Sequence, residues 1–437
     1  MSDRTETADV VVVGCGPGGA VLAYLLARSG ADVALVEREA TFEREYRGFG
    51  WNPGVVRLFD EMDLLDDVRA LAHETVTEGA FSLSGERVPV LDFDLLDTDY
   101  PYALMMEQPG LLELLVERAG EYDGFAFHPA TTVTGLRTDD AGTVHGVDAH
   151  DRERDEDVAF EGHCVVGADG RYSAVRASAG IDPGTFDSPI DLAWFKLPQG
   201  AVTVETEGQL DRDGVLVSFG LGGGELQVGY LLRDGEWPAV REAGFEAFIE
   251  RVAAVDPAVG AAVADHLEGF GDVTLLDVAP GLADTWTRDG LLLLGDAAHT
   301  ASPIGAQGNP LAVEDAVVAH DVLVSALADA ADERGRPRKR PPSASSGIEW
   351  VLSGHRLREF EGRRRPTVER VIGLQRRAAA NLAFWLDYGR DVPTWLVRGS
   401  ARAFGWAVPR SRFVRGLVES FALGDRSVTV TRSHFVE

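Results

Sequence analysis

Three glycine-rich segments of this chain carry residue types that could bind a phosphate or a polyol. The first covers residues 14–19, Gly-Cys-Gly-Pro-Gly-Gly, between an apolar run and a helix-like stretch at 20–29. In this pattern one glycine allows a tight turn, one lets the backbone approach a pyrophosphate, and one allows close helix packing. The helix N-terminus supplies free N–H groups and the positive end of a dipole. A strand–helix turn without a ligand is the alternative. We expect a dinucleotide pyrophosphate to be bound by Gly14, Gly16, Gly18 and Gly19.

A carboxylate follows at the distance that a dinucleotide site requires. Glu37 ends the next apolar run, 18 residues after Gly19. A carboxylate at the end of that second strand accepts hydrogen bonds from an adenosine ribose. We therefore expect Glu37, together with the adjoining Arg38, to contact the adenosine half of the ligand.

The other two segments each place an aspartate after an apolar run. Asp169 lies in Gly-Ala-Asp-Gly-Arg-Tyr-Ser at 167–173, which could equally be a simple Asp-Gly turn before a helix. Asp296 is the second residue of a longer segment, 295–310, and could hold a polyol hydroxyl. The glycine loop that follows it leads into a helix N-terminus. The N–H groups there would stabilise negative charge developing on a bound ring. His299 beside this loop is interpreted as a packing or hydrogen-bonding residue rather than a base.

The elements that must position these segments predict an α/β fold. Strand, glycine turn, helix and strand over residues 10–37 form the pattern of a parallel βαβ unit. Alternating segments at 126–151, with a turn at 139–142, predict a hairpin beside the main sheet. Several strands at 187–232, followed by a helix at 241–267, predict a separate lobe. We expect a Rossmann-like dinucleotide-binding domain with a parallel sheet, a second mixed β-sheet lobe, and a helical C-terminal region.

Composition shifts divide the chain. Residues 331–347 are basic and rich in proline and serine, which predicts a linker. Beyond it, Gln375 and its apolar neighbours fall at helical spacing. The expected division is a discontinuous cofactor domain at 1–74, 104–184 and 272–330, a substrate lobe at 75–103 and 185–271, the linker at 331–347, and a helical region at 348–437.

The charge is unusual. Asp and Glu total 71 against 41 Lys and Arg, for a net charge of −30, and only Lys196 and Lys339 are lysines. Such an acidic surface argues against a nucleic-acid partner. Acid excess with almost no lysine predicts a halophilic source. The tail from residue 334 is the exception, with 21 basic and nine acidic residues.

Other sequence features exclude several classes of protein. Cys15 and Cys164 lie in apolar runs without zinc-ligand spacing, so we expect buried thiols, no disulfide framework and no metal site. No apolar run reaches the length of a membrane-spanning helix, and the start of the chain does not resemble a signal peptide. These features predict a cytoplasmic protein. A monomer or a homodimer is expected.

The three segments, in this order and at these separations, resemble the single-component FAD-dependent aromatic hydroxylases, the para-hydroxybenzoate hydroxylase-like flavoprotein monooxygenases. The resemblance covers about residues 10–327. It implies that the Rossmann-like domain is an FAD/NAD(P)-binding domain and that the mixed-sheet lobe binds substrate. FAD would be the cofactor, NADH or NADPH the co-substrate, and molecular oxygen and a small molecule the other reactants.

The resemblance also implies further roles. Arg47 and Gln108 would contact the phosphate and ribityl region of FAD, and Asp169 would belong to the segment that FAD shares with the nicotinamide nucleotide. Asp296 would bind the ribityl chain, and Pro303 would lie against the isoalloxazine. Along its pyrimidine edge would lie residues 305–309, including Gly305, Gly308 and Asn309. The family's usual asparagine is replaced by Pro310, whose role Asn309 would take one residue earlier.

The activity implied is hydroxylation of an aromatic, quinone-like or polyketide-like ring. The cofactor carries the chemistry, so no catalytic side chain is assigned. Aromatic and polar residues of the lobe should roof the substrate, namely Trp194, Phe195, Phe219, Gln227 and Tyr230. Two alternatives remain open: a flavin-dependent reductase of isoprenoid double bonds, and a flavoprotein whose basic, aromatic tail lies on an anionic membrane. Membrane contact is the less favoured, because a helical cap on the acidic body explains the same residues.

Overall fold

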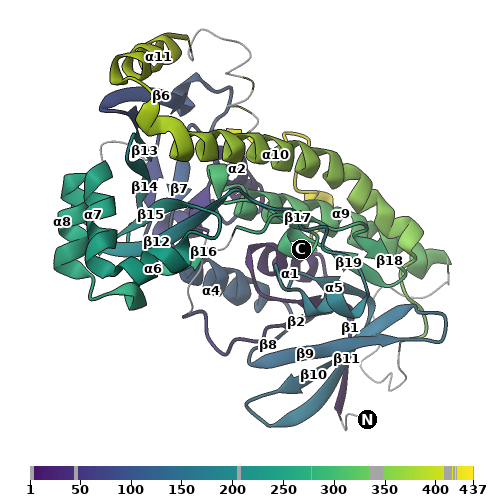
Figure 1. Cartoon of the computed structure of the whole chain (residues 1–437). Helices are drawn as coiled ribbons and strands as arrows, with labels where there is room; N and C mark the ends of the chain where they lie inside the picture. Colours follow the sequence, from purple (N-terminus) through teal and green to yellow (C-terminus); the bar gives the residue numbers. More distant parts are fainter. Residues whose placement is uncertain are drawn as a thin grey trace.

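The structure is a computed structural model that describes residues 4–43, 48–203, 208–276, 278–333, 348–407, 416, 419 and 421–436. The described chain builds two large sheets with a long C-terminal helix beside both (Figure 1).

The first large sheet is the expected parallel sheet. Its central strands are β1 (Arg4–Val13), β2 (Val33–Val36), β8 (Phe125–His128), β11 (Glu156–Gly167) and β19 (Leu291–Leu293), which pair in parallel in the order β19-β11-β1-β2-β8. β18 (Thr287–Arg288) adds an antiparallel edge. The predicted hairpin is present as β9 (Thr131–Thr138) and β10 (Val144–Asp151). β10 also pairs antiparallel with β11.

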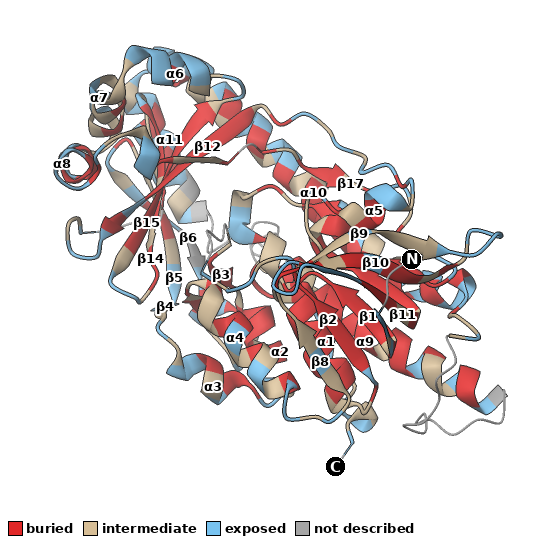
Figure 2. Cartoon of the chain, turned by 90° about the horizontal axis from the view of Figure 1, so that it is seen from below, coloured by how far each residue is buried: buried red, intermediate tan, exposed pale blue. Residues whose placement is uncertain are grey.

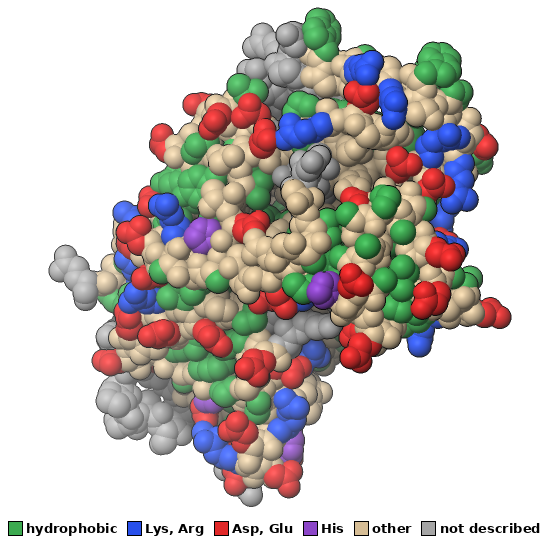
Figure 3. Space-filling model, turned by 90° about the vertical axis from the view of Figure 1, so that its left-hand side faces the viewer, with side chains coloured by type: hydrophobic (Ala, Val, Ile, Leu, Met, Phe, Trp, Pro, Cys, Tyr) green, Lys and Arg blue, Asp and Glu red, His purple; other side chains and the backbone are tan. Residues whose placement is uncertain are grey.

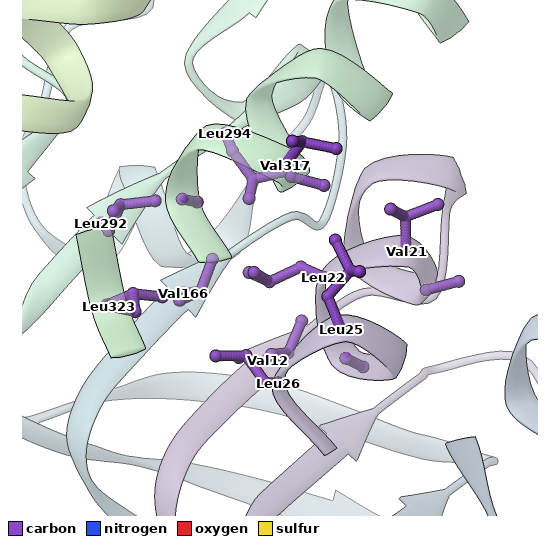
Figure 4. Close-up of a cluster of buried hydrophobic side chains, with 14 of the residues drawn as sticks. Val12, Val21, Leu22, Leu25, Leu26, Val166, Leu292, Leu294, Val317 and Leu323 are labelled. Atoms are coloured by element: carbon purple, nitrogen blue, oxygen red, sulfur yellow. The ribbon is translucent and has the colours of Figure 1, made fainter. Parts of the chain in front are cut away.

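Helices cover one face of this sheet and bury its apolar side chains. α1 (Pro17–Arg28) and α9 (Gly308–Glu333) pack on each other and on β1, β11 and β19. Figure 4 shows their leucine and valine side chains pointing toward one another, among them Val12, Leu22, Val166, Leu292 and Val317. Each of these five side chains is at most 1% exposed. This core holds the glycine segment at 14–19 and the N-terminal end of α9 at the same edge of the sheet.

The second large sheet forms the expected lobe. Its order is β16-β12-β15-β14-β13-β5-β6. The bounds are β5 (Glu78–Leu83), β6 (Glu86–Asp92), β12 (Ile190–Pro198), β13 (Gly208–Asp211), β14 (Gly214–Gly220), β15 (Glu225–Arg233) and β16 (Thr274–Leu276). Its strands pair antiparallel except β13 with β5, so the sheet is mixed. The fold class expected from the sequence is confirmed.

One face of the lobe sheet packs on three helices, where the sequence suggested one helix at 241–267. That expectation was wrong. The helices are α6 (Trp237–Ala243), α7 (Phe245–Val255) and α8 (Pro257–His266). Gly244 separates the first two with φ +95°, a left-handed conformation that suits glycine. Asp256 caps α8 by accepting the amide of Ala258 at 2.8 Å.

Shorter elements connect the two sheets. A small antiparallel sheet has the order β3-β7-β4, and β17 pairs with β20. The bounds are β3 (Gly50–Trp51), β4 (Glu74–Val76), β7 (Ala103–Met105), β17 (Gly281–Leu282), β20 (His299–Thr300), α2 (Pro53–Glu61), α3 (Leu65–Ala70), α4 (Gln108–Ala119) and α5 (Ala174–Ser178).

The two large sheets draw on different parts of the chain. The first takes strands from 4–36, 125–167 and 287–293, and the second from 78–92 and 190–276. β16 belongs to the lobe sheet although it follows residue 272. α9 extends to Glu333, and the rest of the expected linker lies outside the described residues. The domain boundaries stay a proposal. We place the boundary between the lobe and the last part of the cofactor domain after β16, instead of at residue 272.

The C-terminal region is helical, with α10 (Gly354–Tyr388) and α11 (Thr394–Ala407). Several of its arginines pair with acids of the body, such as Arg390 with Asp213 at 3.1 Å and Arg402 with Glu86 at 2.6 Å. The described helices include none long and apolar enough to cross a membrane. Figure 2 shows the red, buried face that α10 turns toward the protein. Acidic and basic side chains intermingle on the surface in Figure 3.

The last described residues, 428–436, return to α1 and α9. Val436 donates its amide to Arg28 O at 3.0 Å, and Phe435 lies under the Arg28 guanidinium at 4.0 Å. Beside them, His320 of α9 is fully buried, with Nε2 2.8 Å from Ser29 Oγ. Burial lowers the pKa of His320 from 6.5 to about 3, because the charged imidazolium is poorly solvated there.

This histidine should make folding sensitive to acid. Between pH 6.5 and about 3 the unfolded chain binds a proton on residue 320 that the folded chain does not. Stability is therefore fully present above pH 6.5 and is lost as the pH falls. We expect the free energy of unfolding of the wild type to fall by up to about 1.4 kcal/mol per pH unit more than that of His320→Gln. Denaturant titrations from pH 7 to 4 measure this pH dependence of the free energy of unfolding. His355→Gln is the control, because His355 is exposed. Parallel pH profiles for wild type and His320→Gln would contradict the prediction.

Candidate active site

A cavity of about 590 Å³ lies between the two large sheets. Its walls come from the glycine segment, the Gly295–Asn309 segment, the lobe sheet and α10. One half is lined mainly by backbone and polar groups, and the other by apolar side chains. The polar half includes Gly16, Gly18, Gly19, Gln108, Gly170, Arg171, Asp296, Pro303, Gly305, Gly308 and Asn309.

The glycines of the first segment have distinct roles. Gly14 has φ +100°, and a Cβ there would lie 2.5 Å from Ala168 O. A Cβ on Gly19 would lie 2.0 Å from Gly14 O, and one on Gly18 would lie 2.7 Å from Leu294 Cδ1. A Cβ on Gly16 would meet nothing within 4 Å. Gly16 therefore borders open space, while the other three allow the turn and the close packing around it.

The residues predicted to contact the adenosine and phosphate groups lie in different surroundings. Glu37 is buried, and its carboxylate accepts the amides of Cys15 at 2.7 Å and Glu39 at 2.9 Å. This places the carboxylate beside the glycine turn. The Arg38 side chain is exposed and pairs with Glu39 at 3.1 Å. Arg47 lies outside the described residues.

The Asp169 side chain forms hydrogen bonds with the turn and helix that follow it. Its carboxylate accepts the Ser173 hydroxyl at 2.5 Å and the Val175 amide at 3.1 Å, at the start of α5. Burial raises the pKa of Asp169, against these hydrogen bonds. The neighbouring Gly170 and Arg171 line the cavity, while the Asp169 side chain holds their turn in place.

Asp296 presents its half-buried side chain to the cavity. Burial raises the pKa of Asp296, against the attraction of Arg171. The backbone around it is held by Asp315 of α9, whose Oδ2 accepts the Gly295 amide at 3.0 Å and lies 2.6 Å from His299 Nε2. His299 is thus engaged with a buried carboxylate, in agreement with its interpretation as a hydrogen-bonding residue.

A polar cluster forms where the Pro303 loop meets α9. Gln108 Nε2 donates to Gly48 O at 2.6 Å and to Asn309 Oδ1 at 3.2 Å. The other amide atom, Asn309 Nδ2, is buried and has no hydrogen-bond partner among the described residues. Such a donor is costly to leave unsatisfied. It therefore points to a missing acceptor at the N-terminal end of α9.

The apolar half of the cavity follows the alternation of the lobe strands. Its lining includes Ile190, Leu192, Trp194, Val215, Val217, Phe219, Leu231 and Leu276. Trp194 and Phe219 pack edge to face with ring centroids 5.9 Å apart, and Phe49 completes a three-ring cluster.

Only part of the predicted roof lies in this wall. Trp194 and Phe219 line the cavity, while Phe195 and Tyr230 pack against Phe248 of α7 on the opposite face of the sheet. Gln227 is buried and donates to Phe195 O at 3.0 Å. A strand shows every second side chain to one face, so adjacent residues such as Trp194 and Phe195 could not both face the substrate.

Sequence reasoning missed the contribution of α10. Gln375 contacts the backbone of the Pro303 loop, and Leu382 lines the cavity. The available signal was a glutamine in the middle of an apolar stripe, since a buried amide needs partners. Phe49 and Met105 also line the cavity and had no sequence signal.

These features fit an FAD molecule. Gly16 leaves the space that a pyrophosphate would fill, Asp296 offers a carboxylate to a polyol, and Asn309 Nδ2 is a buried donor in need of an acceptor. The described residues contain no group of three or more His, Cys, Asp or Glu arranged to hold a metal ion. Cys15 and Cys164 are both buried, as expected.

The fold and the cavity define a flavoprotein of the aromatic-hydroxylase type. A family model described as an FAD binding domain matches residues 7–336, and the chain belongs to that family. The chain is 36% identical over 439 residues to 6-methylpretetramide 4-monooxygenase of Streptomyces rimosus, covering 98% of this chain and 95% of the relative. It is 33% identical to a 12-dehydrotetracycline 5-monooxygenase/anhydrotetracycline 6-monooxygenase of S. rimosus subsp. rimosus, over 71% of this chain and 61% of that longer relative.

Solved structures share the fold. Anhydrotetracycline hydroxylase OxyS of S. rimosus aligns with a TM-score of 0.68 and 25% identity, over 96% of this chain and 76% of that one. p-Nitrophenol 4-monooxygenase PnpA of Pseudomonas putida DLL-E4 aligns with a TM-score of 0.71 and 21% identity, over 97% and 99%. The protein is therefore an FAD-dependent oxidoreductase of the monooxygenase class, and NAD(P)H is the co-substrate typical of its family. The halophilic source stays a prediction.

Two glycine variants should separate cofactor binding from folding. Gly16→Val places its side chain in open space at a position with φ −82°. We expect an unchanged Tm of the FAD-free protein and at least a tenfold higher Kd for FAD. Gly19→Ala drives a Cβ against Gly14 O and should lower the Tm of the FAD-free protein by several degrees. Thermal unfolding and fluorescence titration with FAD measure both effects. Wild-type FAD affinity in Gly16→Val would contradict the assignment of residues 14–19 to the pyrophosphate.

Proposed function

We propose that this enzyme hydroxylates a polycyclic, phenolic, polyketide-like compound, using NAD(P)H and molecular oxygen. The observation that carries the proposal is the cavity itself, whose polar cofactor half continues without a break into an apolar, aromatic half. A flat fused-ring molecule buries its faces well between such walls. The 36% identical relative, matched over nearly its whole length, is named for oxidation of a compound of that class.

Bound FAD supplies the transfer of reducing equivalents from NAD(P)H and the activation of oxygen. The protein's part is to bind, orient and exclude water. The Gly295–Asn309 segment presents the N-terminal end of α9, whose N–H groups stabilise negative charge on a ring beside it. The Phe49, Trp194 and Phe219 cluster excludes water from the reacting face. No nucleophile–base pair is needed, which agrees with the engagement of His299 by Asp315.

The cofactor contacts belong to this proposal. Gly14, Gly16, Gly18 and Gly19 would surround the pyrophosphate, with Glu37 close to the adenosine ribose. Asp296 would accept from the ribityl chain, and Pro303 would lie against the ring system. Gly305, Gly308 and Asn309 would follow the pyrimidine edge, where Asn309 Nδ2 would find its acceptor. Gln108, which donates to Asn309 Oδ1, would contact the phosphate and ribityl region. Arg38 and Arg47 remain expected contacts of the adenosine and phosphate regions, and Asp169 would act by holding the Gly170 turn.

The expected organisation and setting are also proposed. The cofactor domain would comprise residues 1–74, 104–184 and about 277–330, around a substrate lobe of 75–103 and 185–276. A monomer or homodimer in the cytoplasm would suit an enzyme of a diffusible substrate. The ion pairs of Arg390 and Arg402 with the body favour a C-terminal cap over a membrane-bound module.

Oxygen labelling tests the proposed reaction. With FAD, NADH or NADPH, and anhydrotetracycline as a polycyclic probe, we expect substrate-dependent oxygen consumption and one ¹⁸O atom from ¹⁸O₂ in the product by mass spectrometry. p-Nitrophenol, a single-ring probe, should give at most a tenth of that turnover, because it fills little of the apolar half. Saturated product without oxygen uptake would favour the reductase of isoprenoid double bonds. Equal turnover of both phenols would contradict the polycyclic assignment.

The size of the apolar half can be changed at Val217, which lines the cavity on β14. Val217→Phe should raise KM for anhydrotetracycline at least tenfold, because the added ring occupies the space of a substrate ring. KM for p-nitrophenol should change less than threefold. Val217→Ala is the matched control and should not raise KM for the larger phenol tenfold. Steady-state kinetics on both probes measure this, and an equal rise of KM for both in Val217→Phe would show a general defect instead.

A further inference from the structure

We propose that Gln375 of α10 is a positioning residue for the reaction, because it sets the Pro303 loop against the cofactor; this inference rests on the proposed function. Gln375 lies beyond the residues that the family model matches, 7–336. It is fully buried at 1% exposure, and it does not line the cavity itself. Its influence therefore reaches the site through the loop that it holds.

The side-chain amide of Gln375 makes three hydrogen bonds to that loop. Its Oε1 accepts the Ser302 amide at 3.1 Å. Its Nε2 donates to Ser302 O at 2.9 Å and to Ile304 O at 2.8 Å. The amide thus pairs with both backbone groups of Ser302, as a neighbouring strand would, and spans Pro303 from both sides. Pro303 donates no amide of its own, so its position depends on the residues on either side.

A second contact of α10 supports the other end of the same segment. Arg364 is fully buried and donates from Nε to Asp315 Oδ1 at 2.8 Å. Asp315 in turn holds Gly295 and His299. Arg364 and Gln375 are 11 residues apart, which is close to three helical turns, so they lie on one face of α10. The helix therefore supports the cofactor segment at both ends, beside Asp296 and beside Pro303.

The same helix also contacts the substrate lobe. Leu382 lines the cavity next to the apolar wall. Trp385 Nε1 donates to Asp211 O at 2.8 Å, and Asp387 pairs with Arg233 at 3.1 Å. Figure 1 shows α10 running past both large sheets. One helix thus contacts both the substrate wall and the Pro303 loop, and small errors in the distance between two such parts are costly in catalysis.

The experiment compares Gln375→Leu with Val368→Ala. The first keeps approximate volume and removes all three hydrogen bonds. The second weakens the packing of a fully buried α10 residue without touching the loop. In FAD-free protein, hydrogen exchange of the peptide covering residues 301–306 should be at least tenfold faster in Gln375→Leu and unchanged in Val368→Ala. In the FAD-loaded enzyme, we expect product formed per NAD(P)H oxidised to fall at least tenfold in Gln375→Leu and not in Val368→Ala. Gln375→Leu should also shift the visible flavin spectrum and leave KM for anhydrotetracycline unchanged.

Gln375→Glu is the conservative variant, because it keeps the acceptor for the Ser302 amide and loses the two donated bonds. It should restore slow exchange of the Ser302 amide, which Gln375 Oε1 accepts, and it carries the test if Gln375→Leu does not fold. The inference would be overturned if both Gln375 variants showed wild-type hydrogen exchange in this loop and formed as much product per NAD(P)H oxidised as the wild type. Equal defects in Val368→Ala would also overturn it, because the role would then be general packing. A wild-type enzyme that incorporates no oxygen would refute the proposed function, while the exchange result would still report on the loop.

Discussion

The structure depends on the burial of one arginine. Arg364 has no exposed side-chain surface and lies among three carboxylates, those of Asp315, Glu314 and Asp425, at 2.8, 2.7 and 3.7 Å. Burial opposes its charge, yet the pKa of Arg364 is raised because Glu314 and Asp315 surround it. Removing one member of such a group leaves an uncompensated buried charge, which costs several kcal/mol, about 3–5 in studied cases.

This constraint explains how distant parts of the chain converge on the site. The carboxylates come from α9 and from the C-terminal segment, and Asp425 also donates its amide to Glu314 Oε1 at 2.8 Å. Burial would raise the pKa of Asp315, but His299 and Arg364 outweigh it and keep that pKa below its usual value. Asp315 therefore stays ionised and holds the backbone around Asp296. A buried ion network of this kind specifies an arrangement more than it stabilises one.

The lobe sheet shows a second physical division, between its two faces. One face packs on α7 and α8 through a cluster that includes Phe195, Tyr230 and Phe248, and the other presents Trp194 and Phe219 to the cavity. The first face can be filled completely by the protein's own side chains. The second keeps its apolar surface for a ligand, and α10 covers its edge with Ala379, Leu382 and Ala383. Substrate shape in the proposed reaction is thus a property of alternate residues on β12, β14 and β15.

The amino-acid sequence by itself determined the parallel sheet, the glycine turn at 14–19 and a hairpin within 126–151. These follow from local patterns, because strand alternation, positive φ at Gly14 and the spacing to Glu37 are set within a few tens of residues. The family and the FAD cofactor followed from the resemblance of the three glycine-rich segments to those of known flavoprotein monooxygenases. Only the tertiary structure decided that Asp169 binds Ser173 and Val175 at the start of α5 and that His299 engages Asp315. It also decided that Phe195 and Tyr230 face away from the cavity and that Gln375 holds the Pro303 loop. Residues 375 and 302 are 73 positions apart, and local periodicity carries no information about which buried polar groups will meet across such a distance.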